Sequence, residues 1–223
     1  MQSGSAQGES VKRRELVAAV LALWPEQGSG ELSARSLASA ARVNASSIYY
    51  HFSDLEHLYE TAQAEALTLA AQWTDRWHAK LDGVDGMPLQ AFGSLTALLI
   101  DDWCERERVL AFAWRECQLL AARNSRFAPL RDAWSALWRG FWADICVRFG
   151  AAGAAEAASL FFDGEGLLHL MRWSRPIDRA ALEESARTWA GWLDGRLPEA
   201  TPWRVHGRAC AGAPDRTTTI PEG

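Results

Sequence analysis

Several features that would identify a class of protein are missing from this chain of 223 residues. Its uninterrupted apolar runs, such as residues 109–114, are far too short to span a bilayer. Residues 1–10 are polar and rich in glycine and serine, and they contain no apolar segment of the kind found in signal peptides. We therefore expect a cytoplasmic protein with no membrane partner.

Cysteine is scarce and widely spaced. The four cysteines are Cys104, Cys117, Cys146 and Cys210, and they form no C-x-x-C pair. This excludes the usual zinc and redox motifs, and we interpret the cysteines as buried or idle thiols in a reducing cytoplasm. The chain also lacks a P-loop, G-x-S-x-G, H-E-x-x-H or dinucleotide glycine pattern, so no catalytic, cofactor or metal site is expected.

A strong positive charge is absent too, because 23 basic residues stand against 28 acidic ones and leave a net charge of −5. No overall basic field therefore points to a nucleic-acid partner. What is abundant is apolar surface: 48% of the residues are hydrophobic and 12 are tryptophan. This composition excludes wholesale disorder and is enough for a buried core in one domain or two small ones.

Apolar residues recur at helical spacing almost throughout, as in the stripe of Val17, Val20, Leu21 and Trp24. The longest stripe runs over residues 55–81 in steps of three and four. With glycines and prolines as breaks, the pattern predicts helices over residues 11–24, 34–41, 45–50, 55–81, 89–103, 106–123, 128–149, 154–173 and 178–197. Ser33, Asn44 and Ser53 are the expected helix caps, the last within a capping box. We therefore predict an all-α fold.

The front of the chain forms a helix-turn-helix pattern over residues 33–52. Residues 16–58 resemble the DNA-binding head of the TetR family of transcriptional regulators. The family stretch T/S-x-R-x-I-A-x-A-A-G-V is matched by residues 33–43, and L-Y-x-H-F by residues 48–52, without a gap between them. The resemblance implies a three-helix DNA-binding domain, joined through a long fourth helix to a helical ligand-binding and dimerisation domain.

The resemblance also implies which residues meet DNA. The helix that follows Asn44 would be the recognition helix in the major groove. The implied contact residues are Arg35, Asn44, Ala45, Ser46, Ser47, Tyr49, Tyr50 and His51. Arg42 stands where the family has a turn glycine, and Leu55 where a phosphate-contacting lysine is frequent. Residues 11–52 carry a net charge of only +2, from five basic and three acidic residues, so we expect a shallow salt dependence of DNA binding.

The remaining chain is divided by the same resemblance and by composition. We expect a disordered N-terminus (1–10), the DNA-binding domain (11–70), the effector-binding and dimerisation domain (71–197) and a flexible tail (198–223). Apolar stripes on the last two helices can pair with their copies across a two-fold axis. The interface candidates are Phe161, Leu168, Leu182, Trp189 and Leu193. Alternatively, these stripes face the core of their own chain.

An effector pocket is implied among the fourth to eighth helices, where aromatic rings would favour a flat, lipophilic or cationic ligand. The candidates are Trp73, Trp77, Trp103, Trp114, Glu116, Trp138, Trp142, Asp163, Glu165 and His169. The alternative for the tryptophans is an ordinary core. Glu165 and His169 lie four residues apart, a spacing that suits a hydrogen-bonded pair better than a metal site.

We therefore predict a homodimeric transcriptional regulator that acts as a ligand-responsive repressor. As a dimer it would bind a palindromic operator in double-stranded DNA, one half-site for each subunit. Two alternatives stay open. One is an all-helical enzyme, and the other is a helix-turn-helix module that binds a protein partner and no DNA, which the acidic net charge allows.

Overall fold

The computed structural model describes residues 3–86, 89–171 and 179–193, and within these ranges it is helical without a strand. Its elements are α1 (Ser3–Gln27), α2 (Ala34–Ala40), α3 (Ala45–His51), α4 (Leu55–Lys80), α5 (Leu89–Asp101), α6 (Arg108–Arg123), α7 (Ala128–Arg148), α8 (Ala155–Met171) and α9 (Arg179–Leu193), with short turns η1 (Asp102–Arg106), η2 (Ser125–Phe127) and η3 (Ala152–Ala154). The predicted all-α fold is confirmed. The expected tail, 198–223, lies outside the described residues.

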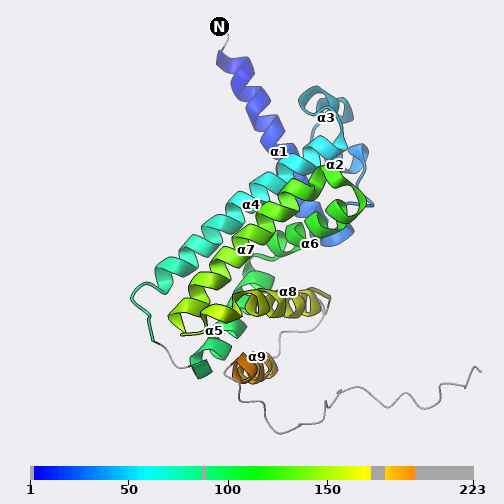
Figure 1. Cartoon of the computed structure of the whole chain (residues 1–223). Helices are drawn as coiled ribbons and strands as arrows, with labels where there is room; N and C mark the ends of the chain where they lie inside the picture. Colours follow the sequence, from blue (N-terminus) through cyan, green and yellow to red (C-terminus); the bar gives the residue numbers. More distant parts are fainter. Residues whose placement is uncertain (1–2, 87–88, 172–178, 194–223) are drawn as a thin grey trace, which may run out of the picture.

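Two groups of helices share one long helix (Figure 1). Helices α1, α2 and α3 gather at the start of α4 and form the part that we call the head. Helix α4 then runs beside α7, away from the head, with α6 packed against both. Helices α5, α8 and α9 close the far end, so α4 crosses the domain boundary expected near residue 70. None of the described helices is long and apolar enough to cross a membrane.

Helix α1 is longer than predicted, because it begins at Ser3 and ends at Gln27. Gly28 follows with a φ of +67°, the left-handed conformation that commonly ends a helix. Its N–H donates a hydrogen bond of 3.0 Å to the carbonyl oxygen of Trp24. The prediction of a disordered N-terminus is therefore wrong for residues 3–10, which are helical.

The helix caps confirm one prediction and correct another. At the start of α2, Ser33 Oγ accepts a bond of 3.1 Å from the N–H of Ser36, and Ser36 Oγ accepts one of 2.9 Å from the N–H of Ser33. At the start of α4 the cap is Asp54, not Ser53, and its Oδ1 accepts a bond of 2.6 Å from the N–H of His57. A carboxylate is favoured there because a helix N-terminus carries partial positive charge.

Most of the tryptophans pack together as an aromatic core. Trp73 on α4 is fully buried, and its ring centroid lies 5.2 Å from that of Trp103, 5.8 Å from that of Trp138 and 5.4 Å from that of Phe141. Trp142 is fully buried as well. The alternative of an ordinary core therefore holds for this part of the predicted pocket.

One polar group organises this core. Asp102 Oδ2 accepts hydrogen bonds from Nε1 of Trp73 (2.9 Å) and Nε1 of Trp77 (3.0 Å), so both indole donors are satisfied. Asp102 begins η1, a π-helical turn between α5 and α6. The break expected between residues 103 and 106 is therefore a widened helical turn, which buries Trp103 and Cys104.

At the far end, α9 packs closely on α5 through a glycine. A Cβ atom added to Gly93 would lie 2.8 Å from the backbone nitrogen of Arg187 and 2.9 Å from its Cα. Leu182 and Ala186, on the same helix as Arg187, are 3% and 0% exposed. The inner face of α9 therefore belongs to the core of its own chain.

Gly93→Ala should lower the free energy of unfolding by about 1–2 kcal/mol, because the added methyl group would push α9 away from α5. The matched control is Gly140→Ala in the middle of α7, where an added Cβ meets nothing within 4 Å. That substitution should stabilise the protein by about 0.5–1 kcal/mol. Urea denaturation followed by circular dichroism measures both, and similar stabilities for the two variants would contradict the close approach.

Candidate DNA-binding surface and ligand cleft

Helices α2 and α3 form the predicted helix-turn-helix, and its inner side is apolar. Leu37 anchors α2, while Ile48 and Phe52 anchor α3, and all three are at most 2% exposed. Arg13 of α1 lies over the ring of Phe52, with its Cζ 5.0 Å from the centroid. Because one side of α3 is held in the core, its other side faces solvent (Figure 1).

Two exposed tyrosines dominate that outer side. Tyr49 is 59% exposed and Tyr50 is 70% exposed, so both rings stand at the surface of the head. Of the predicted contact residues, Arg35, Asn44, Ala45, Ser46, Tyr49 and Tyr50 are exposed, whereas Ser47 and His51 are half-buried. Hydroxyl, amide and guanidinium groups of this kind bind phosphate oxygens and base edges.

Asn44 occupies the N-cap position of α3, as predicted. Its backbone carbonyl oxygen accepts a 2.8 Å hydrogen bond from the N–H of Ser47. Its side chain makes no capping hydrogen bond within the described part of the chain. The amide group of Asn44 is therefore available at the exposed start of the helix.

Arg42 takes the left-handed conformation that its place in the turn requires. Its φ is +53°, the one positive value outside glycine among the described residues. Two backbone hydrogen bonds hold the turn. The N–H of Val43 donates to the carbonyl oxygen of Ala38 at 2.9 Å, and the N–H of Arg42 donates to the carbonyl oxygen of Ser39 at 3.2 Å. For a residue with a Cβ atom, this left-handed conformation costs about 1–2 kcal/mol of conformational energy.

Arg42→Gly should therefore raise the free energy of unfolding by about 0.5–1 kcal/mol relative to Arg42→Ala. Both variants remove the guanidinium group, so their difference isolates the backbone conformation. Thermal and urea denaturation of the two proteins provide the measurement. If Arg42→Ala is at least as stable as Arg42→Gly, the turn does not impose a positive φ at this position.

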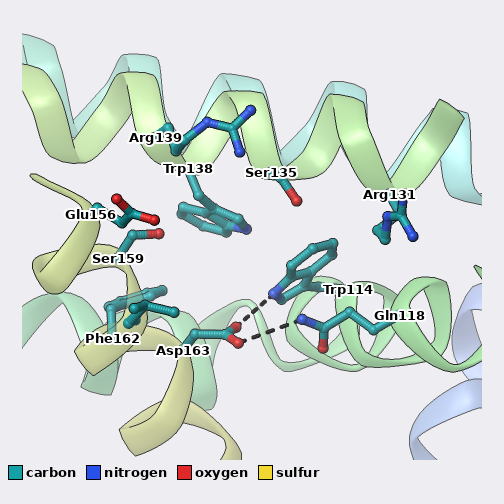
Figure 2. A pocket seen from close by; sticks show the side chains of 11 residues that line it. Trp114, Gln118, Arg131, Ser135, Trp138, Arg139, Glu156, Ser159, Phe162 and Asp163 are labelled. Carbon is teal, nitrogen blue, oxygen red and sulfur yellow. Dashed lines mark hydrogen bonds between the residues drawn. The ribbon is translucent and has the colours of Figure 1, made fainter. Parts of the chain in front are cut away.

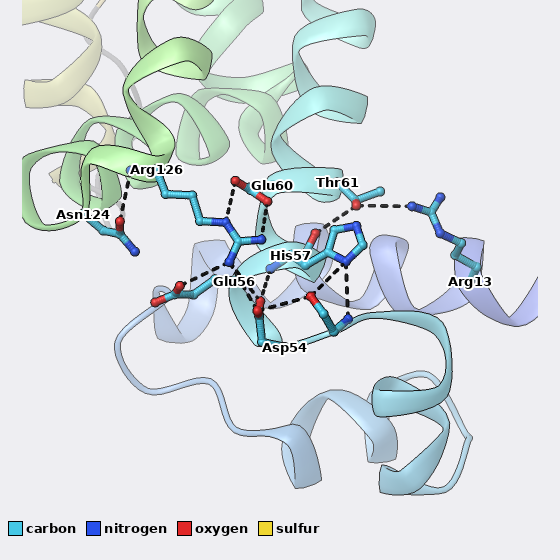
Figure 3. A network of polar contacts seen from close by, with 9 residues as sticks. Arg13, Asp54, Glu56, His57, Glu60, Thr61, Asn124 and Arg126 are labelled. Carbon is cyan, nitrogen blue, oxygen red and sulfur yellow. Dashed lines mark hydrogen bonds and ion pairs between the residues drawn. The ribbon is translucent and has the colours of Figure 1, made fainter.

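A polar network joins the head to the body at the start of α4 (Figure 3). Arg126, from the turn before α7, donates from Nε and Nη2 to the carboxylate of Glu60, each at 2.7 Å. Its Nη1 lies 3.2 Å from Asp54 Oδ1 and 3.4 Å from Glu56 Oε2. The backbone N–H of His57 lowers the pKa of Asp54 most, and Arg126 lowers it further. No local pattern marks Arg126, so sequence reasoning missed it.

Two buried contacts cross the same junction. Gln63 of α4 donates from Nε2 to the carbonyl oxygen of Ala113 at 2.9 Å, and its Oε1 accepts a 3.3 Å bond from Nε1 of Trp134. Glu116 of α6 accepts a 2.9 Å bond at Oε2 from the N–H of Ser29, in the loop after α1. Glu116, predicted to line the pocket, therefore binds the head.

A cleft of about 230 Å³ lies between α6, α7 and α8 (Figure 2). Its lining residues are Trp114, Gln118, Arg131, Ser135, Trp138, Arg139, Glu156, Ser159, Leu160, Phe162 and Asp163. Three predicted pocket residues, Trp114, Trp138 and Asp163, come together here. The other predicted tryptophans, Trp73, Trp77, Trp103 and Trp142, do not line the cleft and are buried in the core.

Asp163 holds one side of the cleft in place. Its Oδ1 accepts 2.7 Å hydrogen bonds from Trp114 Nε1 and from Arg115 Nη1. Gln118 Nε2 lies 3.5 Å from Oδ2 of the same carboxylate. Helix α8 is thereby tied to α6, and the negative charge of Asp163 is balanced by Arg115.

The predicted pair Glu165 and His169 is half-buried on α8 and does not line this cleft. Within the described ranges, no group of three or more His, Cys, Asp or Glu side chains could hold a metal ion. The described cysteines, Cys104, Cys117 and Cys146, are buried free thiols, as interpreted from their spacing. Burial raises the pKa of Cys104 to about 12, which makes this thiol a poor nucleophile.

The predicted interface residues do not all face outward. Leu168 is 40% exposed on α8, whereas Leu182 is 3% exposed inside its own chain, so the assignment of Leu182 to an interface needs correction. Phe161 is half-buried against the core. The side chains of Trp189 and Leu193 lie outside what the structure describes. Helix α8 instead presents an exposed apolar face made of Leu160, Leu167, Leu168 and Met171.

The described residues form a helix-turn-helix head on a helical body. Residues 16–62 match the family model of bacterial regulatory proteins, tetR family. The chain thus carries the N-terminal domain of the TetR family, and the resemblance seen in the sequence is confirmed. No curated protein sequence matches the chain.

Solved structures with the same fold cover the body as well as the head. A transcriptional regulator from Rhodococcus sp. Rha1 is 21% identical, with a TM-score of 0.61, over 81% of this chain and 95% of that one. A TetR-family member from Streptomyces coelicolor A3 is 21% identical, with a TM-score of 0.60, over 80% and 97%. The multidrug binding protein EbrR, complexed with malachite green, is 22% identical, with a TM-score of 0.58, over 79% and 96%.

Proposed function

We propose that this protein is a ligand-responsive transcriptional repressor that binds a palindromic operator as a homodimer. The observation that carries the proposal is the exposed face of α3, where Tyr49 and Tyr50 stand out from a helix whose opposite side is buried. Tyrosine hydroxyls can donate to phosphate oxygens, while Asn44, Ser46 and Ser47 supply groups for base edges.

Dimerisation in this proposal uses the apolar face of α8. Leu160 is 67% exposed and Met171 is 66% exposed, with Leu167 and Leu168 between them at 40% each. These residues lie at intervals of three, four and seven along the helix, so they share one side of it. A contiguous apolar surface of this kind favours pairing with a second copy across a two-fold axis.

Ligand response would pass from the cleft to the head through α6. Trp114 lines the cleft, and its ring is stacked on Trp134 with 5.5 Å between centroids. Trp134 in turn donates to Gln63 of α4, and Glu116, two residues after Trp114, binds the head at Ser29. A ligand that moves Trp114 would therefore disturb two contacts that position the head, and with it the separation of the two recognition helices.

Tyr49→Ala and His51→Ala should each reduce operator affinity at least tenfold without loss of fold. Binding sites selected from random duplex DNA provide the probe, and gel-shift titration provides the affinity. The matched control is Leu119→Ala, which shortens a 48% exposed side chain on α6. Wild-type affinity in both head variants would show that α3 does not face DNA. Failure of the wild-type protein to enrich any sequence would favour the protein-partner alternative.

Met171→Glu combined with Leu168→Glu should convert the dimer into a monomer, because two buried charges would replace apolar contacts across the axis. Sedimentation velocity measures the change. Val147→Glu is the matched control, since Val147 on α7 is 62% exposed and lies outside this face. A double variant that still sediments as a dimer would exclude α8 as the interface.

A further inference from the structure

The cleft contains a buried hydrogen-bond donor without an acceptor. Trp138 is 4% exposed, and its Nε1 atom has no hydrogen-bond partner among the described residues. Figure 2 shows the nitrogen end of this indole directed toward the space beside Trp114. An indole N–H can only donate, and leaving it buried and unpaired carries a cost in free energy. A ligand with an acceptor atom at this point would recover that cost.

Positive charge lines the same side of the cleft. Arg131, Ser135 and Arg139 follow one another at four-residue intervals on α7, so all three border the cleft from one helix. Arg131 also bonds to the neighbouring Asp132, with Nη2 2.7 Å from Oδ1. Arg139 is exposed and forms no ion pair with any residue that the structure describes. Its guanidinium group is therefore available to an anion.

Of the two acidic residues of the cleft, the inner one is already engaged in hydrogen bonds. Asp163 already accepts hydrogen bonds from Trp114, Arg115 and Gln118. Glu156 stands at the rim, exposed, at the start of α8. A cationic ligand would leave the N–H of Trp138 unpaired and would have to compete with Arg115 for Asp163. The donors of the cleft therefore favour a negatively charged ligand group.

The remaining walls are aromatic and the space is small. Trp114 and Phe162 are each at most 6% exposed, and the ring of Phe162 packs against that of Trp138 with 5.3 Å between their centroids (Figure 2). A volume of about 230 Å³ lies below the range of about 300–1,000 Å³ usual for ligand pockets, which favours a small ligand.

We propose that the cleft binds a small aromatic carboxylate. Its carboxylate accepts hydrogen bonds from Trp138 Nε1 and Arg139, and its ring packs against Trp114 and Phe162. The assignment rests on the proposed role of this cleft as the effector site, and it replaces the lipophilic or cationic ligand suggested by the sequence with an anionic one. Contact with Trp114 would also place the ligand at the start of the route to Gln63 and Ser29.

Isothermal titration calorimetry of the full-length protein with 2-naphthoate tests the proposal, with 2-naphthylmethylammonium as the matched probe of opposite charge. The carboxylate should bind at least tenfold more tightly than the amine. Trp138→Phe keeps an aromatic ring, though a smaller one, but removes the N–H, and should weaken 2-naphthoate binding about tenfold. Arg139→Gln alters an exposed side chain and should weaken it two- to fivefold. Arg123→Gln, an exposed arginine outside the cleft, should leave the affinity unchanged.

Equal affinity for the two probes would overturn the proposal, as would undetectable binding of 2-naphthoate at millimolar concentration. Unchanged 2-naphthoate affinity in Arg139→Gln would do the same, even if Trp138→Phe failed to fold. The result is separable from the proposed regulatory function. A protein that binds selected duplex DNA but not 2-naphthoate loses only the ligand assignment, and one that binds 2-naphthoate but no DNA loses only the regulatory function.

Discussion

Burial of one face of helix α4 along its whole length connects the two halves of this molecule. Near its start, Leu58 and Ala62 are fully buried beside the head, and further along Trp73 and Trp77 enter the aromatic core of the body. A helix packed along one face from end to end in this way cannot bend freely, so a tilt imposed at one end displaces the other. The position of α3 relative to the body is therefore decided by what surrounds α4.

Polar contacts at the junction divide into two kinds with different physical properties. The side chains of Gln63 and Glu116 are 0% and 7% exposed. Their hydrogen bonds form only while α6 keeps its position. Arg126 makes its ion pairs at the surface, where long side chains can follow a moving partner. The buried contacts can report small displacements of α6, while the surface pairs keep the head attached during such a change.

The helices were predictable because their signals are local: Gly28 ends α1, and the Ser33–Ser36 box begins α2. The contact residues of the head were predicted from the resemblance to a known family. The cleft was predicted only in part, because core and pocket tryptophans have the same helical spacing. Trp73 lies in the core, where Asp102 accepts a hydrogen bond from its N–H. Trp138 lies at the cleft because α8 approaches it there. Both are long-range contacts that no local pattern encodes.

The surface position of the Arg126 ion pairs also affects how salt acts on this protein. Exposed charges are screened within about 8 Å at physiological ionic strength, and Arg126 reaches Asp54 and Glu60 from the surface. Added electrolyte would weaken the attachment of the head at the same time as it competes for phosphate contacts. The slope of DNA affinity against salt would then include the weakening of these ion pairs as well as the release of counterions from DNA. A count of phosphate contacts taken from that slope would therefore be too high.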